Sequence, residues 1–272
     1  MKGQILFSLF FLISFFNPAI VCAVENVADV IKMLNDNDWR VRDRGVAAAV
    51  IVSDNDQVRV ELIKLLEKEN KQFEDPTEPE TSPSEVINGE YYYDVIKAVV
   101  ALKDPRAIKS LTGSLGTGNT VRKALVSFGE SAIDPLIDAF AKCKGRRIEP
   151  DIVETFNRML NQKAVSVTGK SKIKNLLLNE VDKTPSKRTK QKIIAAFANF
   201  SDDDQVVTIL ESLIASDTYY EMSRVKGRPR TERVKVFPIK EEAEKALGRI
   251  RAKRKEKHQE MPHGTTQQNN TQ

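Results

Sequence analysis

The strongest constraint on the fold is an alternation of two kinds of short amphipathic helical segment along the chain. Segments of the first kind carry apolar residues at helical spacing and lie at 29–34, 60–66, 107–115, 132–140, 172–178 and 206–213. Segments of the second kind carry alanines that let neighbouring helices approach closely, and they lie at 41–52, 93–102, 121–128, 152–160, 190–200 and 241–250. A single long bundle does not explain this alternation, so we expect a repeated two-helix unit.

One of these units resembles a known repeat. Residues 120–140 (TVRKALVSFGESAIDPLIDAF) are similar to a HEAT repeat, in particular to the short HEAT-like repeats of phycobilisome lyases. The shared features are the Val-Arg pair, an alanine at the close contact, a glycine, and a helix that reads Ala-Ile-x-Pro-Leu-Ile. The resemblance extends over about residues 25–253 and is weak at 144–165. It implies an all-α fold, a right-handed α-solenoid (superhelix) of about six antiparallel helix pairs of HEAT-like type.

The same resemblance implies where ligands would bind. In such repeats the second-kind helices line the concave face, and Arg42 and Arg122 occupy the Val-Arg position. That arginine often pairs with an aspartate in a turn of a neighbouring unit, for which Asp38 and Asp104 are candidates, so a structural role competes with ligand contact. Tyr92 is a further candidate, because the successive tyrosines of residues 90–94 (EYYYD) point to different faces of a helix.

The N-terminus has the three-part layout of a secretory signal peptide. Lys2 precedes an apolar run at 5–16, and Val21-Cys22-Ala23 offers a cleavage site between Ala23 and Val24. An uncut anchor and a lipoprotein modified at Cys22 are alternatives, although Val21 is not the small residue that a lipobox requires. No later apolar run is long enough to span a membrane. We expect a signal peptide at 1–23, no transmembrane span in the mature chain, and an exported protein that is periplasmic or secreted.

Three segments interrupt the helical pattern of the expected solenoid domain at 24–253. Residues 74–89 are acidic and proline-rich, which is typical of a flexible loop. A basic insertion at 217–238 separates the last two helices, with a short extended piece expected at 234–237; its candidate binding residues are Arg224, Lys226, Arg228, Arg230 and Arg233. A C-terminal tail at 254–272 is expected to be basic and then polar and disordered. The candidate binding residues in this tail and in the end of the preceding helix are Arg251, Lys253, Arg254 and Lys255.

Residue types used in catalysis are scarce in this chain. Both histidines lie near the C-terminus, and removal of the signal peptide would leave Cys143 as the single cysteine, for which we expect a buried, unreactive position. The Thr-Gly-Lys-Ser sequence at 168–171 lacks the preceding glycine of a phosphate-binding loop, because Ala164 stands there. No Cys/His spacing suits zinc. We therefore expect no catalytic residue, no metal and no cofactor.

Three functional hypotheses remain at this stage. The leading one is an exported, non-catalytic scaffold that binds a protein partner through its concave helix face and long loops. The alternative is binding of a polyanion, an acidic protein or a membrane surface through the basic insertion and the C-terminal tail. The third is an enzyme of lyase-like or hydrolytic kind, because some HEAT-like proteins are lyases.

Overall fold

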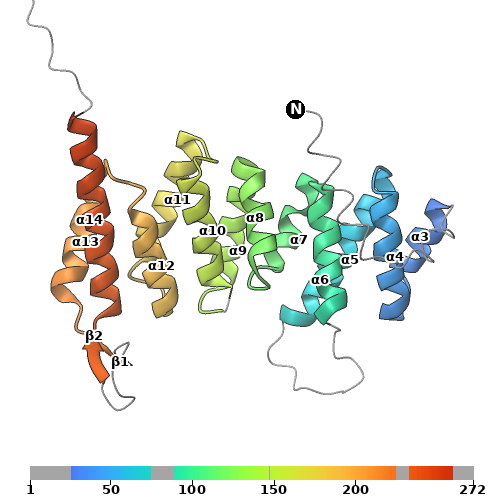
Figure 1. Cartoon of the computed structure of the whole chain (residues 1–272), viewed down its shortest axis with the longest axis horizontal. Coiled ribbons are helices and arrows are strands. Elements are labelled where there is room, and N and C mark those ends of the chain that lie inside the picture. Colours follow the sequence, from blue (N-terminus) through green and yellow to red (C-terminus); the bar gives the residue numbers. More distant parts are fainter. Residues whose placement is uncertain (1–25, 75–88, 147, 225–232, 260–272) are drawn as a thin grey trace, which may run out of the picture. The chain divides into compact units, whose positions relative to one another are not determined.

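The structure is a computed structural model of the 272-residue chain, and it describes residues 26–74, 89–146, 148–224 and 233–259 (Figure 1). These residues are mostly helical, with one two-stranded antiparallel sheet. The expected all-α class is therefore confirmed, and each predicted helical segment of either kind lies largely within a helix. The predicted signal peptide, with Ala23 and Val24, lies outside the described residues, as does the acidic loop apart from Glu74 and Gly89.

The helices divide into two compact units, the first ending at Ala139 and the second starting at Phe140. The elements of the first unit are α3 (Val27–Leu34), α4 (Trp39–Ile51), α5 (Asp56–Glu74), α6 (Gly89–Leu102), the short 3-10 helix η1 (Pro105–Ala107), α7 (Ile108–Gly113), α8 (Asn119–Phe128) and the 3-10 helix η2 (Gly129–Ala132). Helix α9 (Ile133–Lys142) contains the boundary between the units.

The first unit is built from two rows of helices. Helix α6 contacts α4 and α8, and helix α5 contacts α3 and α7. The pairs α3–α4, α5–α6 and α7–α8 connect the rows. The row of α4, α6 and α8 consists of second-kind segments, and we call it the alanine-rich row. Helix α4 of this row approaches α3 of the other row closely: a Cβ atom at Gly45 would lie 2.9 Å from the backbone nitrogen of Leu34.

The helices begin where short polar residues cap them. The side chain of Asn26 accepts from the backbone N–H of Ala28, and that of Asp38 accepts from Arg40. In the same way Ser186 caps α12 (Lys187–Phe197) and Asp203 caps α13 (Asp204–Ser216). These side chains satisfy N–H groups that have no partner within their own helix, which is why such residues mark helix starts in the sequence.

The second unit contains α10 (Glu149–Asn161), α11 (Val167–Glu180), α12 (Lys187–Phe197), α13 (Asp204–Ser216), β1 (Glu221–Arg224), β2 (Arg233–Val236) and α14 (Pro238–Gln259). Helix α12 contacts α10 and α14, and α13 packs on α14. Phe156, Phe197, Leu210 and Ile250 are fully buried in this core. Burial of such side chains contributes about 1.5–3 kcal/mol each.

The basic insertion contains a β-hairpin. Strand β2 corresponds to the extended piece expected at 234–237, whereas its partner β1 was not predicted. Helix α14 then continues to Gln259, beyond the domain boundary predicted at residue 253, so the basic part of the predicted tail is helical. The basic residues of 249–257 extend the helix because Lys and Arg are good helix formers and suit a helix C-terminus.

Candidate functional site

A groove lies on the alanine-rich row between α6 and α8. It encloses about 340 Å³ and is lined by Val100, Lys103, Thr120, Lys123, Ala124, Ser127 and Phe128. Ala124 is buried and Val100 and Phe128 are half-buried, so the floor is apolar, whereas Lys103 and Lys123 on the rim are exposed. Neither lysine makes an ion pair with another residue in the described part of the chain. The groove therefore offers two available cations above an apolar surface.

The residues of α8 that line the groove follow from its helical period. Thr120, Lys123, Ala124 and Ser127 are spaced i, i+3, i+4 and i+7, which places them on one stripe. The opposite stripe, with Val121 and Leu125, is buried. The groove thus uses the solvent side of a helix whose other side is in the core.

Lys103 reaches the rim because α6 ends in a left-handed turn. Its φ angle is +50°, which is unusual for a residue with a side chain, and its backbone N–H donates to the carbonyl of Val100 at 3.2 Å. The next residue, Asp104, caps η1 by accepting from the N–H of Arg106 at 2.9 Å. The turn that carries Lys103 is therefore fixed from both sides.

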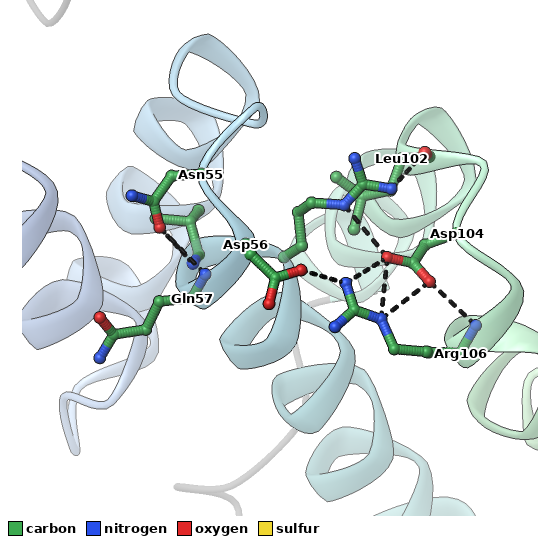
Figure 2. A network of polar contacts seen from close by, with 8 residues as sticks. Asn55, Asp56, Gln57, Leu102, Asp104 and Arg106 are labelled. Carbon is green, nitrogen blue, oxygen red and sulfur yellow. Dashed lines mark hydrogen bonds and ion pairs between the residues drawn. The ribbon is translucent and has the colours of Figure 1, made fainter.

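A network of charged side chains holds this turn (Figure 2). The carboxylate of the buried Asp104 accepts from Nε of Arg59 at 3.1 Å and from Nη2 of Arg106 at 2.7 Å, and Arg106 also bonds Asp56 at 2.6 Å. Arg59 donates to the carbonyl of Leu102 at 3.2 Å. The Arg106 side chain, and then the other hydrogen bonds, hold the pKa of Asp104 well below its usual value against the effect of burial. The network joins α5 to the end of α6.

Two buried polar networks join α4, α5, α6 and α7. In the first, Arg42 donates from Nε to the Tyr91 hydroxyl at 2.9 Å and contacts Glu69 at 3.2 Å, and Tyr91 donates to Glu69 at 3.0 Å. In the second, the Asn70 amide oxygen accepts from Tyr92 at 2.6 Å and from Ser114 at 2.9 Å. A buried network whose polar groups have hydrogen-bond partners stabilises one specific arrangement of the helices that it joins. Burial is the largest cause of the raised pKa of Tyr91, so its hydroxyl stays protonated.

These contacts show how three candidate binding residues, Arg42, Arg122 and Tyr92, are held in the fold. Arg42 and Tyr92 are buried and bonded within the protein, so their position is structural. Arg42 pairs with Glu69 and with neither predicted aspartate, and Asp104 pairs with Arg59 and Arg106. Arg122 is half-buried on α8 and donates to Asn119 at 2.8 Å.

The basic residues at the C-terminal end of α14 are engaged with neighbouring helices. Lys253 donates to the carbonyl of Ala198 at 2.9 Å, and Arg254 donates to the carbonyl of Ser201 at 2.6 Å. Further ion pairs join Arg254 to Asp204, Arg251 to Glu211 and Lys257 to Asp202. Lys255 is exposed. Of the predicted binding residues in this segment, three have partners within the chain.

The basic insertion is described only in part. Arg224 and Arg233 lie opposite each other in the hairpin. Lys226, Arg228 and Arg230 lie outside the described residues.

A second hollow, of about 320 Å³, lies in the second unit where α12 begins and α13 ends. Its two lysines already have partners. The Nζ atom of Lys187 lies 3.5 Å from the ring centroid of Tyr219, and Lys190 pairs with Asp182 at 3.3 Å. The lysines of the α6–α8 groove have no such partners in the part of the chain that the structure describes, which makes the groove the stronger candidate.

Cys143 is buried, as expected. Burial raises the pKa of its thiol to about 11, which suppresses the reactive thiolate. The described residues contain no group of His, Cys, Asp and Glu side chains arranged to hold a metal ion. Among the described helices, none is both long and apolar enough to cross a membrane.

Lys103 and Lys123 were not predicted as site residues. The helical spacing of Thr120, Lys123 and Ser127 in the sequence would have placed Lys123 on the same stripe of α8 as the other groove residues. No sequence pattern would have identified Lys103, because its position at the rim depends on the left-handed turn. Comparison with protein-family models, with curated proteins and with solved structures gave no match to this chain.

Proposed function

We propose that this protein is an exported, non-catalytic α-solenoid of HEAT-like helix pairs that binds a partner protein through its alanine-rich row. The α6–α8 groove carries the proposal: it is a hollow with an apolar floor and two exposed lysines that lack ion-pair partners in the described part of the chain. Repeat proteins stack neighbouring helices into long surfaces of this kind, which suit extended or helical segments of a partner.

The charge of the row indicates the chemistry of the partner segment. Arg44, Lys97 and Lys123 are exposed on its three helices, and Lys103 is exposed in the turn after α6; of these, Lys97 pairs with Asp94 at 2.8 Å. Asp43 is half-buried, and burial first and then the charge of Asp94 raise the pKa of its carboxyl. The surplus of exposed cations favours an acidic segment, and the floor of Val100 and Phe128 favours apolar side chains within it.

Binding of defined peptides tests this proposal. Three fluorescent peptides of equal length would alternate leucine with glutamate, glutamine or lysine, and fluorescence polarisation would report their affinity for the purified chain. We expect the glutamate peptide to bind most tightly and to lose affinity as salt is raised, because the attraction is between exposed charges.

Charge-reversal variants locate the binding surface. Lys103→Glu with Lys123→Glu should weaken binding of the glutamate peptide at least tenfold, about 1.4 kcal/mol. The matched control is Lys32→Glu with Lys68→Glu, which reverses two exposed lysines on α3 and α5. Equal losses in the two double variants, or equal affinity for all three peptides, would contradict the proposal.

A further inference from the structure

The β-hairpin exposes apolar side chains to solvent. Tyr220 is 46% exposed, Met222 49% and Val234 45%. These three are half of the large apolar side chains that are exposed in the described part of the chain, the others being Ile51, Tyr93 and Val167 on separate helices. An isolated two-stranded hairpin is at best marginally stable in water. Exposed apolar side chains gathered on one small element indicate that this element is a binding surface.

The register of the hairpin gathers apolar and cationic residues on one face. Met222 lies opposite Lys235, and Arg224 lies opposite Arg233. Because alternate residues share a face of a strand, Tyr220 and Met222 are on the same side as Lys235. The Nζ atom of Lys235 lies 4.4 Å from the ring centroid of Tyr220, whose ring is 6.2 Å from that of Phe237. This face combines an aromatic ring, a thioether and an ammonium group.

The nearby acidic groups are already used within the protein. Asp217 accepts from the backbone N–H groups of Tyr219 and Lys240, both at 3.1 Å. Glu221 accepts from the hydroxyl of Tyr219. The two carboxylates hold the chain at the base of the hairpin, and neither forms an ion pair with Lys235, whose ammonium group is exposed.

The two basic segments of this chain lie at opposite ends of α14 (Figure 1). The hairpin precedes the helix, and Arg254 and Lys257 lie near its other end. A helix of 22 residues is about 33 Å long, so the segments do not form one patch. At the far end Arg254 and Lys257 are paired with α13 and the turn before it, whereas Lys255 is exposed. The hairpin differs in presenting exposed apolar side chains beside its exposed cation.

We propose that the hairpin face of Tyr220, Met222 and Lys235 docks on the surface of an anionic lipid bilayer. The tyrosine ring suits the headgroup level, the lysine ammonium can contact lipid phosphates, and the methionine side chain can enter the upper acyl region. Among the described residues no third strand pairs with the hairpin, and backbone groups left open along its outer edges restrict it to the interface and prevent deeper insertion. The exposed Met222 side chain on this face favours lipid over nucleic acid, which offers it no apolar phase.

Vesicle sedimentation tests the docking. The purified chain should sediment with vesicles of phosphatidylglycerol mixed with phosphatidylcholine, and not with phosphatidylcholine alone. Lys235→Glu should lower the apparent affinity about tenfold, because it changes two units of charge at the surface. Met222→Ser should lower it about fivefold without a change of charge. Lys32→Glu, an equal charge reversal on α3, is the control and should leave binding within twofold.

A tryptophan reporter identifies the part of the protein that meets the lipid. In Met222→Trp the new fluorophore should shift to the blue on vesicle binding and be quenched by brominated lipid. In Val167→Trp, at an exposed position on α11, it should do neither. The chain has one native tryptophan, Trp39, which contributes equally to both variants. Because Met222 and Val167 are exposed, both variants should retain the helical circular dichroism of the unmodified chain.

The outcomes separate this proposal from the one for the groove. Lys103→Glu with Lys123→Glu should weaken peptide binding and leave vesicle binding intact, and Lys235→Glu should do the reverse. Absence of sedimentation with anionic vesicles, or sedimentation insensitive to both hairpin substitutions, would overturn the docking proposal. So would tight binding of a DNA oligonucleotide that Lys235→Glu weakens, if vesicles do not bind.

Discussion

Gly45 and Gly248 are both helical glycines, but their surroundings differ. A Cβ at Gly45 would lie 2.9 Å from both the backbone nitrogen of Leu34 and the Cβ of Met33, whereas one at Gly248 would meet nothing within 4 Å. Gly45→Ala should therefore lower the free energy of unfolding by about 1–3 kcal/mol, because backbone atoms of α3 must move. Gly248→Ala should raise it by about 0.5–1 kcal/mol. Urea denaturation measures both changes, and equal effects would show that α3 and α4 do not pack this closely.

The ionisation of Asp104 makes the free energy of unfolding depend on pH, and the direction of this dependence follows from its lowered pKa. Its pKa is lowered in the folded protein, chiefly by Arg106, so its contribution to stability is complete above about pH 4 and is lost as the pH falls further. Asp104→Asn should cost about 2–3 kcal/mol near neutral pH, because Arg59 and Arg106 lose a charged partner. The difference from the unmodified protein should shrink as the pH falls below about 4.

Denaturation at a series of pH values measures this difference. Asp182→Asn is the control, because that carboxylate is 75% exposed and its pairing with Lys190 should contribute less than about 1 kcal/mol. A small and pH-independent effect of Asp104→Asn would mean that the carboxylate acts only as a helix cap, because asparagine caps helices about as well as aspartate.

At the scale of elements, the C-terminal end of α14 should stabilise the start of α13. The guanidinium of Arg254 donates to the carbonyl of Ser201 and to Asp204, whereas the neighbouring Lys255 is exposed. Arg254→Ala should lower the free energy of unfolding by about 1 kcal/mol, and Lys255→Ala should change it by less than about 0.5 kcal/mol.

Hydrogen exchange gives a local measure of the same contact. In Arg254→Ala, amides in the first turns of α13 should exchange faster than in the unmodified protein, while those of α10 remain protected. Faster exchange along the whole second unit would instead indicate global destabilisation.

The helices could be predicted because their signals are local. Apolar spacing and capping residues such as Asp38, Ser186 and Asp203 act within one or two turns, and they place the starts of α4, α12 and α13. The strand β1 could not be predicted in this way. Its sequence Glu-Met-Ser-Arg has no strong strand preference, and its conformation depends on pairing with β2.

The candidate site was harder to predict than the helices. The sequence indicated which helices would form a surface, but not which of their charges would be used internally. Arg42 has the same charge as Lys123, yet Glu69, Tyr91 and two carbonyls bury the first and leave the second at the rim of the groove. These partners lie up to 49 residues away along the chain, so neither spacing nor composition reveals them.

At the scale of the whole molecule, cleavage of the proposed signal peptide would leave one thiol. Cleavage between Ala23 and Val24 removes Cys22 and leaves Cys143, which is buried and has a pKa raised to about 11. At about pH 8 only about one thiol in a thousand is then ionised. We expect the exported native protein to react very slowly with a thiol reagent, and to react with one equivalent once guanidinium unfolds it.

The same measurement distinguishes the possible fates of the N-terminus. A chain that keeps a free Cys22 should show one thiol that reacts at once and a second on unfolding, and a lipidated Cys22 should show one slow thiol together with a mass increase. The mass of the intact protein identifies its first residue independently. A first residue of Val24 with a fast-reacting thiol would contradict the burial of Cys143, because no other cysteine remains in that chain. A slow single thiol also prevents disulfide-linked dimers, so the mature protein should run as a monomer on a non-reducing gel.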